Sequence, residues 1–397
     1  MRIGIILDQT IKSGGGFYQS VNAIFQFIKL CKDEFDVVVY TTHLESIATL
    51  AVTGIKAKYL KLTVIDRHFH LLATSSIFVN YQRIMKLIAP FERSLIADQV
   101  DIIYFLSPTV LALCLQKLNY IFTVWDLCHR DNPEFPEVHE FGEFERREMI
   151  YSRCIAKSLL CIVDSEKLVE RIMHRYGIDK ERLLAIPFSP SYSVTENIIS
   201  LETDTCILER YGLEPGYLFY PAQFWAHKNH VRILQALKQL NERGRVVQLV
   251  LTGGDQGNRL HVENTATELN VRSQVHFLGF IPSKDIPTLY RNSLALVMPT
   301  YFGPTNLPPL EAWAMEIPII YPNIFRDFGD DAALYFDIED QISLMLSIEQ
   351  VFDMSMRRLL IKNGKRRFEC ISVDKINAEN NLLHLLRRFS QRKSCWC

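Results

Sequence analysis

The sequence predicts an α/β protein with two Rossmann-like domains of parallel β-sheet that face a central cleft. Short, continuous apolar runs alternate with segments of helical spacing along both halves of the chain. A length of 397 residues suits two domains better than one. Ligands of such sheets bind beyond the carboxyl ends of the strands, which is why a cleft between the two sheets is expected.

Composition narrows the possible functions. Apolar residues make up 48% of the chain, and a net charge of −1 gives no reason to expect nucleic acid as a partner. The nine cysteines include no Cys-x-x-Cys pair, which fits reduced thiols. No apolar run approaches the roughly 18 residues of a membrane span, and Ile3–Leu7 follows Met1 without the basic region of a signal peptide. We therefore expect a cytoplasmic protein.

The first half of the chain alternates predicted strands and helices. Phe17–Cys31 has apolar residues at helical spacing, and Glu166–Tyr176 is a predicted helix that ends at Gly177. Continuous apolar strands are typical of a parallel sheet covered on both faces. The predicted strands are Ile3–Leu7, Phe35–Tyr40, Ile102–Leu106, Tyr120–Val124, Leu159–Val163 and Leu183–Ile186.

The segment Ile65–Leu95 is rich in apolar residues and has two interpretations. Its apolar residues could pack into the core of the first domain. They could instead form an apolar or membrane-facing surface that serves an acceptor, and the sequence leaves both open. The residues concerned are Phe69, Leu71, Leu72, Ile77, Phe78, Tyr81, Ile84, Leu87, Ile88 and Phe91.

The second half repeats the alternation after a linker rich in serine and proline, Ser189–Glu196. Residues 1–195 are expected to form the first domain and 196–374 the second. Ser355–Glu369 and Lys375–Arg388 are amphipathic and basic. The predicted strands are Tyr217–Tyr220, Gln248–Leu251, Val275–Leu278, Leu294–Val297 and Ile319–Ile320, and the predicted helices are His230–Asn241, Ile286–Asn292 and Pro309–Met315.

One strand–loop–helix corner, Met298–Ala312, organises the second half. Two prolines, Pro308 and Pro309, suit a first helical turn, because proline loses nothing there by lacking an N–H group. The loop before them brings backbone N–H groups and a helix N-terminus together, which favours a phosphate or diphosphate. Glu311 can accept hydrogen bonds from sugar hydroxyls beside that phosphate. An ordinary corner, with Glu311 complementing the helix dipole, is the alternative.

This corner resembles the donor-binding motif of the retaining glycosyltransferases of family four, the glycosyl transferases group 1, which have the GT-B fold. Leu307, Pro308, Glu311 and Ala312 match the usual pattern Glu-Gly-Phe-Gly-Leu-Pro, two residues, Glu-Ala. Gly303 stands where the first Glu is usual. Thr305 and Asn306 replace the Phe and a Gly. The resemblance runs over nearly the whole chain and is strongest from Tyr217 to Tyr335.

Two first-domain motifs fit the same resemblance. Gly14, Gly15 and Gly16 follow the first strand and open a helix, where backbone N–H groups can approach an anion. They do not form the G-x-G-x-x-G fingerprint, so NAD is disfavoured. Asp126 matches the Asp of the family's His-Asp pair, while Trp125 takes the place of the His. The resemblance implies that Asp126 or His129 contacts hydroxyls of the transferring sugar or acceptor; His129 could equally be a surface loop histidine.

The segment Tyr220–His230 resembles the family's segment with an Arg followed by Lys-Asn. Lys228 and Asn229 match, and Gln223 stands in place of the Arg. Lys228 is a point charge suited to a diphosphate whose negative charge grows as the glycosidic bond breaks. A surface lysine is the alternative, although a lysine at a helix start opposes the dipole.

Two further turns follow predicted strands of the second half. The pair Gly253 and Gly254 resembles the family's turn near the nucleotide. Phe280 and Ile281 lie in the turn that presents backbone groups to the nucleobase in the family, although each could be an ordinary turn between strand and helix. No Asp-x-Asp triplet or metal-type Cys/His cluster occurs in the sequence, so we expect neither a metal nor another cofactor.

The resemblance implies a retaining glycosyltransferase that needs no metal and takes a nucleotide-diphosphate sugar, of the GDP-mannose or dTDP-rhamnose type. The acceptor would be a saccharide or lipid-linked saccharide in the assembly of a surface polysaccharide such as lipopolysaccharide. The protein could then lie peripherally at the inner face of a membrane, with residues 375–397 as a helix that crosses back to the first domain. An inactive nucleotide-sugar-binding subunit and a sugar-nucleotide epimerase of the same fold are the rival interpretations.

Overall fold

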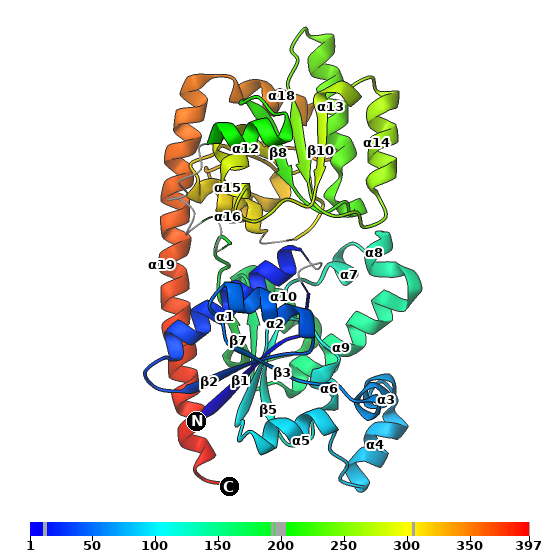
Figure 1. Ribbon diagram of the computed structural model, residues 1–397, viewed down its shortest axis with the longest axis vertical. Coiled ribbons are helices and arrows are strands. Elements are labelled where there is room, and N and C mark those ends of the chain that lie inside the picture. Colours follow the sequence, from blue (N-terminus) through cyan, green and yellow to red (C-terminus); the bar gives the residue numbers. More distant parts are fainter. Residues whose placement is uncertain (11–13, 192–193, 195–203, 304–305, 397) are drawn as a thin grey trace. The chain divides into compact units, whose positions relative to one another are not determined.

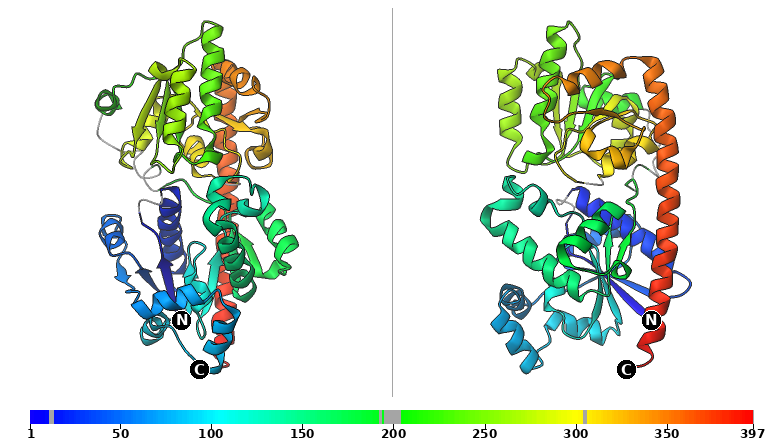
Figure 2. Two further views of the ribbon diagram at one scale, coloured as in Figure 1. Left: turned by 90° about the vertical axis from the view of Figure 1, so that its right-hand side faces the viewer. Right: turned by 180° about the vertical axis from the view of Figure 1, so that it is seen from behind.

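The computed structural model describes residues 1–10, 14–191, 194, 204–303 and 306–396 (Figure 1). The chain divides into two compact units, each built around a twisted parallel sheet with helices on both faces (Figures 1 and 2). The predicted fold class is therefore confirmed. The first unit comprises Met1–Pro133, Val138–Pro187 and Asp374–Cys397, and the second comprises Glu134–Glu137 and Phe188–Val373.

The first unit has a seven-stranded sheet of order β3-β2-β1-β4-β5-β6-β7. All its pairings in the described part of the chain are parallel; β1, for example, sets Ile3 beside Val37 and Ile102. The six predicted strands are present, and β3 was missed because it is a three-residue edge strand with little apolar character. The strands are β1 Arg2–Leu7, β2 Asp36–Thr41, β3 Ala57–Tyr59, β4 Ile102–Phe105, β5 Asn119–Thr123, β6 Leu160–Val163 and β7 Leu183–Ala185.

Side chains alternate between the two faces of this sheet, as the period of a strand requires. Ile3, Ile5 and Leu7 of β1 join a core beneath α1 and α2, whereas Ile6 joins the core on the opposite face beneath α5, α6, α9 and α10. The helices are α1 Gly15–Cys31, α2 Leu44–Val52, α3 Val64–Leu72, α4 Ser76–Ile84, α5 Pro90–Ala97, α6 Leu111–Cys114, α7 Cys128–Asp131, α8 Pro136–His139, α9 Glu143–Lys157 and α10 Glu166–Tyr176. The first two residues of α8, Pro136 and Glu137, belong to the second unit.

The second unit has a six-stranded parallel sheet of order β10-β9-β8-β11-β12-β13. Strand β13 was not predicted; it too has three residues and lies at an edge. The strands are β8 Tyr217–Pro221, β9 Leu249–Thr252, β10 Val275–Gly279, β11 Ser293–Val297, β12 Ile319–Pro322 and β13 Leu334–Phe336. The helices are α12 Asp204–Tyr211, α13 His230–Glu242, α14 Arg259–Glu268, α15 Ile286–Arg291, α16 Leu307–Ala314, α17 Arg326–Gly329 and α18 Ser343–Val351.

The C-terminal segment is one helix, α19 Met354–Lys393, where the sequence suggested two amphipathic segments (Figure 1). Its residues up to Val373 belong to the second unit and those from Asp374 to the first. Leu382 and Leu386 pack into the first unit's core. Since the helical pattern has no breaker between the two amphipathic segments, nothing in the local sequence interrupts it.

No helix within the described residues is both long and apolar enough to cross a membrane.

Candidate functional site

The turn after β8 positions Lys228. A 3₁₀ turn, Ala226–Lys228, is followed by Asn229 in the left-handed conformation (φ 52°), and α13 begins directly after it. The Tyr220 hydroxyl donates to the Lys228 carbonyl oxygen over 3.1 Å, which ties the turn to the strand. The Lys228 ammonium donates to Oδ1 of Asn306 over 3.2 Å. Lys228 is therefore aimed at the loop that follows β11.

Asn306 links three parts of this corner. It is the residue before α16, and its Nδ2 donates to the Gly303 carbonyl oxygen and, over 3.0 Å, to the Tyr321 hydroxyl. Its Oδ1 accepts a hydrogen bond from the Lys228 ammonium, so a cationic side chain lies at the N-terminus of α16. Two sources of positive potential thus converge where the sequence predicted a phosphate. Pro308 and Pro309 lie in the first turn of α16, as expected.

Gly303 cannot be exchanged for the family's usual Glu without rearranging this corner. Its φ is 103°, a conformation that side chains disfavour, and a Cβ would lie 2.7 Å from Oδ1 of Asn306. Asn306 thus occupies the space into which a Glu at 303 would project. Thr305, a predicted diphosphate contact, lies outside the described residues, and Leu307 is the first residue of α16.

Glu311 is buried one turn into α16, with 7% of its surface exposed. Its Oε1 accepts from the Ser191 hydroxyl at 2.5 Å and from the Ser191 backbone N–H at 3.3 Å, and Oε2 accepts from the Tyr290 hydroxyl at 2.9 Å. Burial raises the pKa of Glu311, although these hydrogen bonds oppose the shift. A sugar hydroxyl that bound Glu311 would have to take the place of one of these donors. The sequence did not predict either donor residue, Ser191 or Tyr290.

A second pair of residues that the sequence did not predict, Glu137 and His227, holds the Lys228 turn in place. Oε1 of Glu137 accepts from the His227 backbone N–H over 3.0 Å and pairs with Nδ1 of the same residue. The His227 ring stacks on Phe302 at 3.8 Å, and its carbonyl oxygen accepts from the Tyr301 N–H. Burial alone would raise the pKa of Glu137, but the hydrogen bonds from His227 lower it below its ordinary value. The Lys228 turn and the loop after β11 are therefore joined.

The remaining predicted residues of the second unit lie at neighbouring strand ends. Gly253 has a φ of 122°, and a Cβ there would lie 2.6 Å from the Ala222 carbonyl oxygen, so only glycine fits where β8 and β9 end together. Oε1 of Gln223 accepts from the Trp225 indole at 3.2 Å. A Cβ on Gly254 would meet no atom within 4 Å. Phe280 is 60% exposed and Ile281 is buried.

In the first unit, the glycine turn packs against Trp125. A Cβ on Gly16 would lie 2.9 Å from the indole ring, whereas one on Gly15 would meet nothing. Gly15 and Gly16 open α1, as predicted. The residue that replaces the family's His thus fills the space beside the turn, and a side chain at position 16 would require the Trp125 ring to shift.

Asp126 and His129 both make polar contacts with other residues of the first unit. Oδ1 of Asp126 accepts from the Cys128 N–H at 3.0 Å and pairs with Arg147 at 3.5 Å. His129 has a completely buried side chain that lies against Phe144 and Tyr151.

The interpretation of His129 as a surface histidine is therefore wrong, because the short helix α7 turns the ring inward. Nε2 pairs with Glu148 at 3.3 Å, and burial lowers the pKa of the imidazole. The ring offers no exposed area to a sugar. Within the described residues, no group of three or more His, Cys, Asp or Glu is arranged to hold a metal ion.

Comparison with known sequences matches residues 210–367 to the family of glycosyl transferases group 1. The chain is 26% identical over 223 residues to O-antigen chain mannosyltransferase B of Escherichia coli, covering 53% of this chain and 58% of that protein. It is 25% identical over 206 residues to O-antigen chain mannosyltransferase RfbU of Salmonella typhimurium, covering 51% and 53%. The chain thus spans about half the length of the curated relatives it matches.

Two solved structures extend the likeness to the whole chain. Anabaena Alr3699/HepE in complex with UDP and glucose has a TM-score of 0.71 at 16% identity, covering 98% of this chain and 99% of that one. WaaG, a glycosyltransferase involved in lipopolysaccharide biosynthesis, has a TM-score of 0.67 at 15% identity, covering 95% and 98%. The chain therefore matches the glycosyl transferases group 1 over residues 210–367 and has the GT-B fold, as the resemblance predicted.

Proposed function

We propose that this protein is a metal-independent, retaining glycosyltransferase that moves a sugar from a nucleotide-diphosphate sugar to a saccharide or lipid-linked saccharide. The observation that carries the proposal is the Lys228–Asn306 contact at the N-terminus of α16, with Glu311 one turn further on. A diphosphate would meet a cation and a helix N-terminus there, and a ribose would meet a carboxylate beside them.

The compared proteins support a role in surface polysaccharide assembly. Two relatives are O-antigen chain mannosyltransferases, and the complex of Anabaena Alr3699/HepE contains UDP and glucose. Because both relatives transfer mannose, GDP-mannose is the first donor to test, with dTDP-rhamnose second. A lipid-linked acceptor would bring the protein to the inner face of a membrane from the cytoplasm.

Charge balance explains how transfer would proceed without a metal. When the bond between the sugar and the diphosphate breaks, negative charge develops on the leaving phosphate oxygen. The Lys228 ammonium and the N-terminus of α16 stabilise that charge. The acceptor hydroxyl attacks the face that the diphosphate leaves and gives its proton to the departing phosphate oxygen, so the anomeric configuration is retained. We assign the sugar and acceptor side to the first unit, with Asp126 as the predicted hydroxyl contact; His129 positions Glu148 instead.

A binding screen followed by an assay tests this function. Thermal-shift titrations with GDP, UDP, dTDP and ADP sugars should single out one nucleotide. Transfer with that donor should then persist in EDTA, and NMR of the product's anomeric proton should show retention. Loss of activity in EDTA that Mg²⁺ restores would refute the metal-free mechanism, and an inverted product would refute retention.

The inactive-subunit alternative has one structural argument in its favour. Gly303 and Gln223 stand where the family carries charged residues, and the Gln223 amide is held by Trp225. Donor binding without transfer or donor hydrolysis, over a range of saccharide acceptors, would favour this alternative. Conversion of the free nucleotide sugar without an acceptor would indicate an epimerase.

A further inference from the structure

The helices α3 and α4 expose an unusual share of the apolar side chains. Nine of the 25 large apolar residues that are exposed among the described residues lie between positions 64 and 85, so the exposure is concentrated. Figures 1 and 2 show both helices projecting from the edge of the first unit. We call this set the α3–α4 surface: Val64, Ile65, Leu71, Leu72, Ile77, Val79, Tyr81, Ile84 and Met85.

These residues recur at helical spacing on the outward sides of the two helices. In α4, Ile77, Tyr81 and Ile84 are 80%, 52% and 70% exposed, and their spacing of four and three places them on one face. The opposite face holds the buried Gln82, whose amide donates to the Cys114 carbonyl oxygen. The interpretation of this segment as core packing is therefore wrong for five of the ten residues, Leu71, Leu72, Ile77, Tyr81 and Ile84, whereas Phe91 is in the core and Phe69 packs against it.

The inner faces are well anchored, so the exposure is not a sign of a loosely attached segment. Asp66 is completely buried and accepts from the Thr63 N–H and from the Phe91 N–H of α5. Phe69 and Phe78 meet edge to face at 5.3 Å, and the Arg153 guanidinium donates to the Ala73 carbonyl oxygen. The two helices are therefore attached to the first unit through their inner faces.

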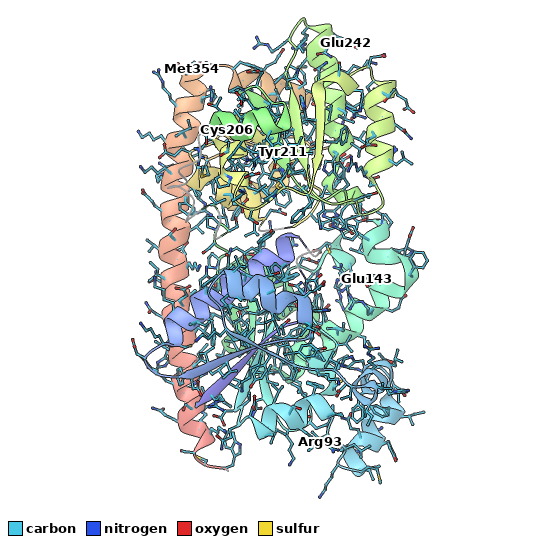
Figure 3. The ribbon with its side chains drawn as sticks, in the orientation of Figure 1. Arg93, Glu143, Cys206, Tyr211, Glu242 and Met354 are labelled. Carbon is cyan, nitrogen blue, oxygen red and sulfur yellow. The ribbon has the colours of Figure 1, made fainter. Side chains whose placement is uncertain are left out.

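The charges around the α3–α4 surface have one sign. Between residues 61 and 97 the chain has two acidic residues, Asp66 and Glu92, and both are completely buried. Glu92 accepts three backbone N–H groups, from Gln116, Lys117 and Leu118. Figure 3 labels Arg93 at the outer edge of α5. The exposed charged residues of this segment are Lys61, Arg67, Arg83, Lys86 and Arg93, all basic.

We propose that the α3–α4 surface binds a bilayer that contains anionic phospholipid. Apolar side chains enter the boundary between headgroups and acyl chains, and the basic residues pair with anionic headgroups. A second protein would also bury apolar residues, but the exposed charged residues between positions 61 and 97 are all basic, which favours a uniformly anionic partner. The proposal gives a surface to the membrane contact of the proposed function, but lipid binding is measured without donor or acceptor, so its failure would leave the proposed transfer untouched.

Cosedimentation of the full chain with sucrose-loaded vesicles tests it. Binding is expected to vesicles of phosphatidylcholine with phosphatidylglycerol, weaker to phosphatidylcholine alone, and weaker again at high salt, because salt screens exposed charges. Ile77→Ser combined with Ile84→Ser should reduce the partition coefficient roughly tenfold or more. The matched control, Val246→Ser with Leu260→Ser, removes two residues of similar exposure from the second unit and should bind as the wild type does.

A variant that lacks two of the basic residues distinguishes binding to anionic lipid from non-specific hydrophobic adsorption. Arg67→Gln combined with Arg83→Gln should weaken the preference for phosphatidylglycerol, because Lys61, Lys86 and Arg93 remain, and should leave the melting temperature unchanged. Wild-type protein that fails to bind anionic vesicles would overturn the proposal. So would equal binding by the Ile77/Ile84 variant. A dimer that this variant converts to a monomer, without any lipid binding, would assign the surface to a second copy of the chain.

Discussion

The polar residues that the sequence predicted as site residues lie in two corners after strand ends, one in each unit. The contacts of these residues differ between the two corners. At the second unit's corner, Lys228 and Asn306 meet at a helix N-terminus, where a ligand with negative charge would be stabilised. At the first unit's corner, Asp126 is paired with Arg147 and His129 is enclosed between aromatic rings. The second unit's corner thus offers positive potential to a ligand, whereas the polar residues of the first unit's corner make contacts within their own unit.

The largest effect that we expect in this comparison of the two corners is on the free energy of unfolding, at His129. Replacing His129 with Ala should destabilise the protein by about 2–4 kcal/mol, because it opens a cavity beside Phe144 and Tyr151 and removes a partner of Glu148. Urea denaturation measures the loss. The exposed His174→Ala on α10 is the control and should have little effect. Unchanged stability with lost transfer would instead make His129 a sugar contact.

The second unit's corner should show the opposite behaviour. Lys228→Ala and Glu311→Gln should leave the melting temperature within a few degrees while each weakens nucleotide binding by about 1.5–3 kcal/mol, the size of a charge-assisted contact. Isothermal titration measures the affinity. Lys238→Ala on the exposed side of α13 is the matched control for the lost charge. If both variants bind nucleotide as tightly as the wild type, this corner is not the donor site.

A buried histidine beneath the Lys228 turn predicts a pH dependence. His230 stacks on Phe224 at 4.5 Å, and burial lowers its pKa to about 3. Between the unfolded value of about 6.5 and that value, the unfolded chain binds more protons than the folded one. Stability should therefore fall as the pH falls from about 6.5, by up to about 1.4 kcal/mol per pH unit.

Replacement of His230 by Phe keeps the stacking and removes the titrating group. The pH profile of unfolding in urea should flatten below pH 6.5 relative to the wild type. His276→Phe is the comparison variant, since burial also lowers the pKa of His276 but that ring is more exposed. A profile that His230→Phe leaves unchanged would mean that other groups dominate acid unfolding.

The smallest expected effect concerns Gly303. Gly303→Ala should cost about 1 kcal/mol of stability because of its positive φ. The new Cβ should also displace Asn306 and release Lys228, so nucleotide affinity should fall more than it does in Gly254→Ala, where a Cβ meets no atom. Equal affinities in the two variants would show that Asn306 does not position Lys228 for the donor.

Much of the fold follows from local pattern, and the failures have a physical cause. The apolar runs identified the central strands of both sheets, and the helix predicted over Glu166–Tyr176 is α10, whose N-terminus the Ser165 hydroxyl caps. The edge strands β3 and β13 were missed because each has three residues, which is too short for a strand pattern to be recognised. The structure brings Lys228 and Asn306 of the candidate site into contact, but Ser191, Tyr290, Glu137 and His227 gave no signal in a single sequence.

The sequence by itself determined the two-sheet architecture, the prolines that start α16 and the corner that holds Lys228. These depend on turn chemistry and on periods of two and 3.6 residues, which act between near neighbours. Tertiary structure alone decided that Glu137 joins His227, 90 residues away, and that Ser191 meets Glu311, 120 residues away. It also decided which apolar faces are covered: periodicity shows that α3 and α4 each have an apolar face, but only packing shows that no other described part of the chain lies over it.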